Sequence, residues 1–177
     1  MRVVGIDDGG FQKGITKKAY LAMVLLEGLS IEAVNFAKAT VDGFDATDKA
    51  IGVLKKLDFD VVMLSGVSFA GFNLIDPVKL YEETRKPNVV VTLEKPDNTA
   101  VKRALMRHFK DWRLRWGVFE ELGPIYEVKV VADASPLFIE VVGADVSWAV
   151  SLIKALTVFG KTPEPIRTAR LIARGVS

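Results

Sequence analysis

The first ten residues place two acids and two glycines directly after a short apolar run. Residues 3–6 form that run, which is typical of a buried strand, and Asp7-Asp8-Gly9-Gly10 follows it. Carboxylates at the mouth of a central strand suit a hard divalent cation. They also suit the start of a turn, and that alternative stays open here. Because side chains alternate along a strand, we expect only one of Asp7 and Asp8 to face a site, unless Gly9 breaks the strand.

Two more apolar runs follow with no room for a helix between them. Lys18–Glu27 is apolar enough for a central strand, and residues 29–41 alternate for much of their length. This tight spacing predicts an antiparallel meander of three strands. After Asp45, a candidate N-cap, the apolar residues follow a helical period. A short apolar run at residues 61–64 then predicts a buried strand. A helix that joins two strands in this way makes the sheet mixed.

The later elements are predicted from caps, prolines and β-branched runs. We expect helices after the caps Asp76, Asp97 or Asn98, and Asp145, a strand at residues 88–93 as the last core strand, and a hairpin near the C-terminal third. The predicted ranges are 77–86, 98–109, 146–159 and 163–173 for the helices, and 125–131 with 137–142 for the hairpin.

Composition limits the classes of function. At 177 residues, half of them hydrophobic, we expect one domain, residues 1–177. A net charge of +2 permits nucleic acid as a partner without implying it. No cysteine is present and His108 is the one histidine, so thiolate catalysis and multi-histidine metal sites are excluded. Without a signal peptide or a membrane-spanning run, a cytoplasmic protein with no membrane partner is expected.

The predicted strand order indicates an α/β, ribonuclease H-like fold with a mixed central sheet, its first three strands antiparallel and helices on both faces. In that fold, acids at the ends of the first strand and its neighbours converge on one edge of the sheet. Asp7, with Asp42 or Asp45 after the third strand and Ser65 or a later acid after the fourth, would meet there. Oxygen ligands at such a point select Mg²⁺ or Mn²⁺, the ions used in phosphodiester hydrolysis.

Four blocks carry a resemblance to a known family. They are GIDDG at residues 5–9, VDGFDAT at 41–47, SGVSFAGFN at 65–73 and PEPIRTA at 163–169. Together they resemble the archaeal family called domain of unknown function ninety-nine, or endonuclease dU, over nearly the whole chain. That family is considered a distant relative of endonuclease V, a ribonuclease H-like enzyme that cuts next to deaminated bases such as hypoxanthine with a magnesium-bound carboxylate cluster.

The resemblance implies roles for individual acids. Asp7 matches the first-strand motif of endonuclease V and would be a metal ligand. The chain departs from that enzyme at Ser65-Gly66, where endonuclease V has Asp-Gly, and its glutamate after the third strand has no clear equivalent unless Asp42 or Asp45 replaces it. We therefore expect Asp7, Asp42 and Asp45 as metal ligands, and these three with Asp8 as catalytic acids. For Asp45, an N-cap role is the competing interpretation.

Two segments are candidates for contact with nucleic acid. In the loop at residues 65–73, glycines would let the backbone approach a ligand and an aromatic ring would stack on a base; the alternative is that both rings belong to the core. In the basic stretch at residues 102–115, cations alternate with aromatic residues, although a solvated helix face over buried tryptophans would give the same pattern. The candidate residues are Ser65, Gly66, Phe69, Gly71, Phe72, Asn73, Arg107 and Arg113.

Two functions follow as hypotheses. The first is a metal-dependent endonuclease, using Mg²⁺ or Mn²⁺, that acts on deaminated or otherwise damaged DNA or RNA and so serves DNA repair. The second is a non-catalytic nucleic-acid-binding protein that kept the fold and lost part of the carboxylate cluster. A small-molecule phosphohydrolase or a protein-interaction module is a weaker third interpretation.

Overall fold

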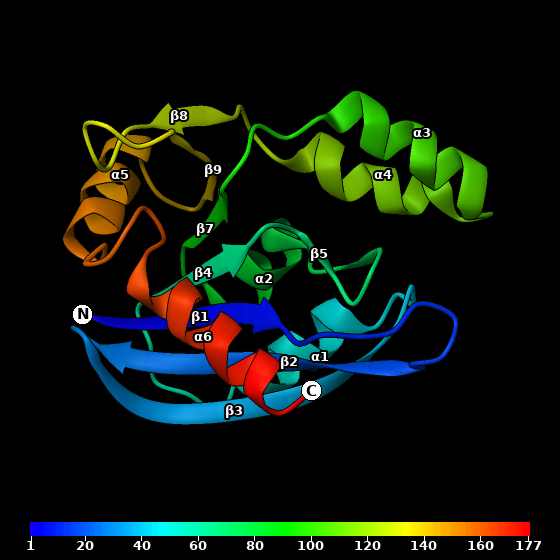
Figure 1. Cartoon of the computed structure of the whole chain (residues 1–177), viewed down its shortest axis with the longest axis horizontal. Helices are drawn as coiled ribbons and strands as arrows, with labels where there is room; N and C mark the ends of the chain where they lie inside the picture. Colours follow the sequence, from blue (N-terminus) through cyan, green and yellow to red (C-terminus); the bar gives the residue numbers. More distant parts are fainter.

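A seven-stranded mixed sheet forms the centre of the protein, and helices cover both of its faces (Figure 1). The computed structural model describes all 177 residues. The strand order is β3-β2-β1-β4-β7-β9-β8, so the first strand lies inside the sheet, beside the second and the fourth. This is the order of the ribonuclease H-like fold, and the predicted fold class is confirmed. None of the helices is long and apolar enough to cross a membrane.

The N-terminal strands follow the prediction closely. β1 (Arg2–Asp8), β2 (Lys18–Glu27) and β3 (Ser30–Thr40) form the antiparallel meander, and β4 (Val61–Ser65) then pairs with β1 in parallel. β2 and β4 are buried along most of their length, which explains why their sequences are continuous apolar runs. β3 is an edge strand, so its alternating pattern has one solvent-exposed face.

The C-terminal half extends the sheet beyond the predicted last core strand. β7 (Asn88–Thr92) pairs in parallel with β4, but β9 (Leu137–Val142) pairs antiparallel with β7 and β8 (Tyr126–Val128) lies at the edge. The expected hairpin is therefore confirmed, while the expectation that residues 88–93 form the last core strand is wrong. The pairing of β7 with β9 joins segments far apart in the chain, so it leaves no local signal in the sequence.

Two layers of helices enclose the sheet. α1 (Ala46–Leu54) and α2 (Pro77–Thr84) pack on one face, where Ile6 and Leu64 belong to the larger core cluster. α5 (Val146–Ala155) and α6 (Glu164–Gly175) pack on the other face, with Val3 and Met63. Figure 1 shows α6 crossing in front of β1 and β2 toward the C-terminus. Side chains of β1 therefore face α6 or α1 alternately.

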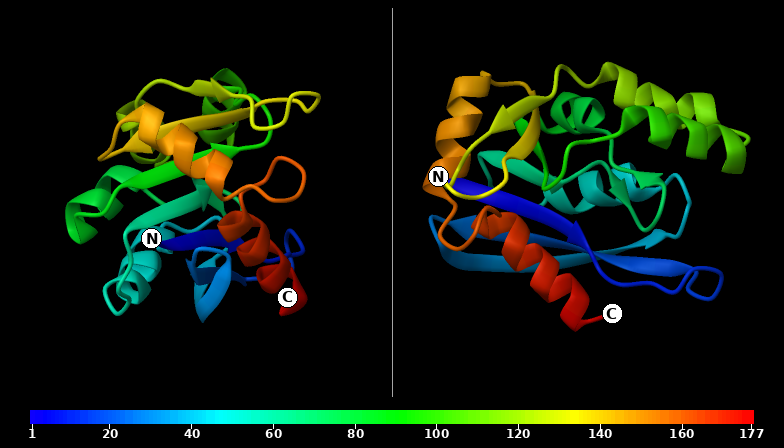
Figure 2. Two further views of the ribbon diagram at one scale, coloured as in Figure 1. Left: turned by 90° about the vertical axis from the view of Figure 1, so that its left-hand side faces the viewer. Right: turned by 45° about the horizontal axis from the view of Figure 1, so that its top comes forward.

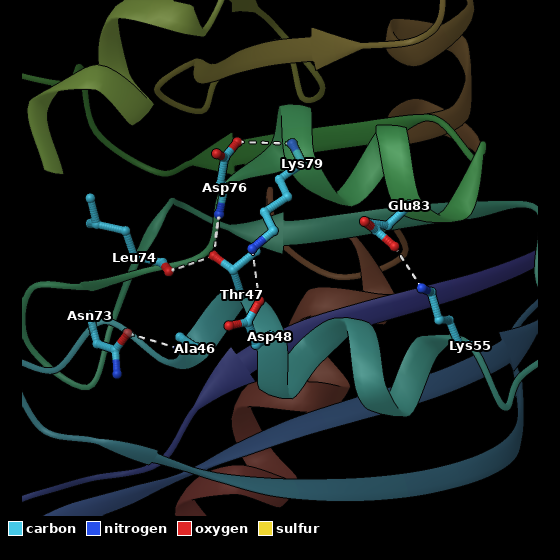
Figure 3. A network of polar contacts seen from close by, with 9 residues as sticks. All are labelled: Ala46, Thr47, Asp48, Lys55, Asn73, Leu74, Asp76, Lys79 and Glu83. Atoms are coloured by element: carbon cyan, nitrogen blue, oxygen red, sulfur yellow. Dashed lines mark hydrogen bonds and ion pairs between the residues drawn. The ribbon is translucent and has the colours of Figure 1, made fainter. Parts of the chain in front are cut away.

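Polar contacts join α1 to α2 and to the short hairpin of β5 (Ser68–Phe69) and β6 (Asn73–Leu74). Figure 3 shows the side chain of Asn73 accepting a hydrogen bond from the amide of Ala46, at the first turn of α1. It also shows the ion pairs Lys79–Asp48 and Lys55–Glu83 between the two helices. These exposed pairs contribute little each, so the buried Asn73 is the stronger link.

The predicted caps divide into two groups. Asp76 accepts from the amides of Val78 and Lys79, and Asp97 accepts from Ala100, so both are N-caps. Asp45 and Asp145 stand at the N-cap positions of α1 and α5 but make no side-chain cap bond. The N-cap interpretation of Asp45 is wrong because Asn73 bonds the first amide of α1 instead, from 27 residues away.

A pair of helices, α3 (Asn98–His108) and α4 (Trp112–Glu121), lies at one end of the molecule (Figure 2). α3 was expected, but α4 was not. Only Arg115 and Val118 of α4 are buried, so the segment has no apolar stripe from which its helical period could be recognised.

Candidate functional site

Asp7 lies near the carboxyl end of β1 and is the centre of the candidate site. Its side chain points toward α6, since Gly5, two residues earlier on the same face, contacts the start of that helix. A Cβ at Gly5 would overlap the main chain of Pro165, so only glycine lets α6 approach β1 this closely. The close approach leaves Asp7 only 5 % exposed.

The partner of Asp7 is Arg170, from the middle of α6. Arg170 Nε donates to Asp7 Oδ2 at 2.8 Å, and the same guanidinium donates through Nη2 to Ser65 Oγ at 2.8 Å. Ser65 ends β4, the parallel neighbour of β1. The arginine thus joins the ends of both central strands, and it neutralises a carboxylate that is almost fully buried.

Asp8 faces the opposite side of the sheet. Its Oδ2 accepts a hydrogen bond from the amide of Ala70 at 2.6 Å, and Ala70 belongs to the core cluster beneath α1. Burial raises the pKa of the Asp8 carboxyl, and the charge of Asp7 adds to the effect, while the Ala70 hydrogen bond partly opposes it. The expectation that Asp7 and Asp8 face different sides is confirmed.

Asp42 and Asp45 stabilise the loop that follows β3. Asp42 adopts a left-handed backbone with φ 54°, and its Oδ1 accepts from the amide of Phe72. Asp45 accepts from the amide and hydroxyl of Thr40 and from the side chain of Asn73. Desolvation opposes ionisation of Asp45, but the hydrogen bonds from Asn73 and Thr40 outweigh it and hold its pKa below the usual value.

These contacts contradict the predicted metal site. No group of three or more His, Cys, Asp or Glu side chains is arranged to hold a metal ion, so Asp7, Asp42 and Asp45 do not form one ligand set. The reason is that Asp42 and Asp45 are engaged by loop amides and side chains, as described above. Mg²⁺ is often held by one or two carboxylates together with substrate phosphates. Asp7 is a single carboxylate that does not line a pocket itself, but its partner Arg170 and the neighbouring Ser65 line one, so the second mode is the one that the residues present fit.

That pocket measures about 410 Å³ and lies between the carboxyl ends of β4 and β7 and the face of α6. Ser65, Thr92 and Thr162 give it hydroxyl groups, Lys95 and Arg170 give it positive charge, and Glu94 adds one negative charge. A concave site with hydroxyl donors and two cations against one acid suits an anionic ligand such as a phosphate.

A buried arginine holds the neighbouring loops in place. Arg115 of α4 is 4 % exposed, and its guanidinium donates to the carbonyls of Asp42, Gly43 and Phe72. It also pairs with Asp111, whose pKa is lowered by this hydrogen bond. The loop after β3 and the loop after β5 are thus bound to the same helix.

The predicted nucleic-acid loop divides into buried and accessible residues. Phe69 is 1 % exposed in the core and Asn73 is fully buried, so the prediction that these two contact nucleic acid is wrong. Phe69 packs in the larger core cluster, and the side chain of Asn73 is hydrogen-bonded inside the fold. Gly66 and Gly71 have positive φ angles, and Phe72 is partly exposed, with its ring edge-on to Phe109.

Phe72 also lines a second pocket, of about 480 Å³, at the base of the α3–α4 pair. Phe11, Lys13, Asp42, Gly71, His108 and Phe109 complete its lining. Arg107 of α3 and Arg113 of α4 are exposed, and Arg113 lies over the ring of Trp112. Their contact with nucleic acid stays a prediction.

The sequence reasoning missed Arg170, although a signal was present. Ile166, Ala169 and Ala173 of α6 are buried against the sheet, and Arg170 falls on the same helical face. A single cation inside an apolar stripe needs a buried partner. Asp7, which was expected at the end of a central strand, is that partner.

The chain is similar to known proteins over its whole length. A family model described as "Endonuclease dU" matches residues 1–177. A UPF0215 protein of Thermococcus gammatolerans is 38 % identical over 183 residues, which cover 99 % of this chain and 92 % of that protein. A crystal structure of a protein of unknown function from Archaeoglobus fulgidus is 32 % identical, with a TM-score of 0.87 over 99 % of this chain and 97 % of the other.

A more distant similarity extends to endonuclease V. The Ciona intestinalis enzyme, crystallised with a 23mer DNA containing an inosine followed by a ribo-adenosine, has a TM-score of 0.62 at 18 % identity, over 99 % of this chain and 84 % of the other. At that level of identity the comparison concerns the fold. The family match over the full length is the stronger result, and by it the chain belongs to the endonuclease dU family.

Proposed function

We propose that this protein is a nuclease that cleaves a phosphodiester bond in DNA or RNA next to a deaminated base. The observation that carries the proposal is the placement of Asp7, Arg170 and Ser65 together at the ends of β1 and β4, beside the 410 Å³ pocket. The proposed nuclease function is also supported by the similarity of the fold to an endonuclease V crystallised with inosine-containing DNA.

In this proposal the chain's own residues bind and orient the phosphate. Arg170 and Lys95 attract the phosphate into the pocket, and the planar guanidinium suits two-point contact with phosphate oxygens. When the phosphate engages Arg170, the Asp7 carboxylate loses part of its neutralising partner. It is then available to orient a water or to hold a cation.

Mg²⁺ or Mn²⁺ would be held by Asp7 together with the substrate phosphate, and would stabilise negative charge on the phosphoryl oxygens. Asp42 and Asp45 have no part in holding it. Asp8, on the other face, fixes the position of the strand end through Ala70.

The test is cleavage of labelled oligonucleotides that carry uracil or hypoxanthine, as DNA and as RNA, with Mg²⁺, with Mn²⁺ and with chelator. Asp7→Asn should lower the rate at least about 100-fold, the lower end of what a positioned acid or base contributes. Asp48→Asn serves as the control, because Asp48 is an exposed acid on α1. Equal rates for native protein and Asp7→Asn would exclude the mechanism.

A second candidate is binding of nucleic acid without cleavage. It is favoured by one observation, that an arginine already neutralises Asp7 in a site whose neighbouring strand ends in a serine. It predicts salt-sensitive binding of the same oligonucleotides, with no product in any metal.

A further inference from the structure

A small pocket with a buried acid lies on the other side of β7 from Arg170. It measures about 190 Å³, and Gly66, Ser68, Thr92, Asn98, Phe119 and Glu140 are among its lining residues. Thr92 and Pro96 line both this pocket and the 410 Å³ pocket, so the two are neighbours. A ligand could therefore place one group in each.

Glu140 is the unusual member of this lining. It stands in the middle of β9, opposite Val90 of β7, and is 7 % exposed. Its carboxyl oxygens take part in no hydrogen bond or ion pair of the structure, although every other buried acid has a partner: Asp7 has Arg170 and Glu164 has Arg167. Neither oxygen is fully enclosed, because Asn88 Oδ1 is the one enclosed side-chain atom without a hydrogen-bond partner, so the carboxyl of Glu140 can be reached from the pocket that it lines.

We propose that the pocket of Glu140 binds one nucleobase ring, and that the carboxyl of Glu140 recognises a ring edge that presents a hydrogen-bond donor next to an acceptor. The identity of the ring as a nucleobase rests on the proposed nucleic-acid substrate. The donor–acceptor pattern of the ring edge is inferred from Glu140 alone. A neutral carboxyl has one O–H donor and one C=O acceptor side by side, so it pairs with an acceptor next to a donor.

The size of the pocket supports a single ring. Pockets for whole drug-sized ligands measure about 300–1,000 Å³, so 190 Å³ accommodates only part of a nucleotide. The lining combines apolar side chains, including Val67, Val101 and Phe119, with hydroxyl and amide groups at Ser68 and Asn98. An apolar slot with a few polar groups is the usual environment of a flat heterocycle. The neighbouring 410 Å³ pocket would receive the attached phosphate.

Burial also sets the protonation state that this recognition requires. Desolvation raises the pKa of Glu140 from 4.5 to about 7. No charged side chain from β4, β7, α3 or α4 lines the pocket beside it, so desolvation is the one cause. Below pH 7 the carboxyl is neutral and can donate; above it, the carboxylate can only accept.

The experiment measures binding of free 2′-deoxyuridine by NMR, following the proton signals of the nucleoside, at about pH 6 and about pH 8.5. Affinity should fall more than about tenfold between these values, because the donor is lost. Glu140→Gln keeps one donor and one acceptor at every pH, so it should bind with little pH dependence. Glu140→Leu should not bind measurably at either pH. Glu127→Gln, an exposed acid on the neighbouring strand β8, is the matched control.

The outcomes separate this inference from the proposed nuclease. Nucleoside binding that depends on Glu140 supports the pocket even if no oligonucleotide is cleaved. Cleavage that continues unchanged in Glu140→Leu, with equal rates on uracil and abasic sites, would overturn the pocket and leave the nuclease intact. Binding of 2′-deoxyuridine that ignores both pH and the Glu140→Leu substitution would also overturn it.

Discussion

The buried carboxyl of Glu140 should make the stability of the whole protein depend on pH. Its pKa is about 7 when folded and 4.5 when unfolded, so between these values the unfolded chain loses a proton that the folded chain keeps. The free energy of unfolding should therefore fall as pH rises from 4.5 to 7, by about 1–3 kcal/mol for this group, because water that reaches the carboxyl from the pocket screens part of the effect. Below pH 4.5 the group contributes no pH dependence.

Urea denaturation at about pH 4.5, 6 and 8 measures this effect. In Glu140→Gln the decline over this window should be smaller by about the same amount, because the amide does not titrate. The comparison uses the change with pH within each variant, so any fixed cost of a buried amide cancels. Parallel curves for the native protein and Glu140→Gln would contradict the assignment of a buried, unpaired carboxyl.

At the level of single residues, sequence reasoning succeeded where the partner was local. Asp76 was correctly predicted to cap the amides two and three residues ahead. Asp45 was misjudged because its partners include Asn73, 28 residues away. Asp7 was correctly placed at a strand end, but its ion pair with Arg170 spans 163 residues, so nothing in the sequence near Asp7 reveals its partner.

At the level of elements, α4 depends on one anchor. Arg115 donates to three carbonyls in the loops after β3 and β5, and its guanidinium lies 4.2 Å from the centre of the Phe109 ring. Arg115→Leu leaves these carbonyls unpaired, so the free energy of unfolding should fall by about 2–4 kcal/mol. Amide hydrogen exchange should also accelerate in residues 42–44 and at Phe72.

Arg113→Leu is the matched control for this element. Arg113 belongs to the same helix but is exposed, so its replacement should change stability by no more than about 0.5 kcal/mol. An equal decrease in stability in both variants would mean that the helix itself, rather than the buried guanidinium, holds the loops.

The elements that could be predicted are those whose sequence pattern reflects burial. β1 and β2 are apolar because both faces of the sheet are covered, and their bounds were recovered closely. α4 buries an arginine and one valine, so its pattern resembles that of a solvated segment. Its position is determined by hydrogen bonds to distant carbonyls, which composition does not reveal.

At the level of the whole molecule, the order of the first four strands was enough to predict the fold, because short connections restrict the topology. The convergence of the acids could not be predicted in the same way. Strand ends were expected to bring Asp7, Asp42 and Asp45 together, yet Asp42 lies in a left-handed turn that directs its carboxylate to the amide of Phe72. Topology brings chain segments together, while local hydrogen bonds decide where each side chain points.

The distribution of charge over the molecule leads to a last prediction. The net charge is only +2, but exposed cations gather on the α3–α4 pair, among them Arg107 and Arg113. If this surface binds nucleic-acid phosphates, the logarithm of the binding constant should fall linearly with the logarithm of salt concentration. Replacing both arginines by glutamine should reduce the slope by about 1.4 for single-stranded DNA, about 0.7 for each phosphate that is no longer neutralised.

The control is the double variant Lys49→Gln with Lys56→Gln. These lysines are exposed cations in and just after α1, so their replacement should leave the salt slope unchanged. Fluorescence anisotropy from about 50 to 300 mM salt measures the slopes, and equal slopes for the two double variants would show that the α3–α4 pair does not bind the backbone.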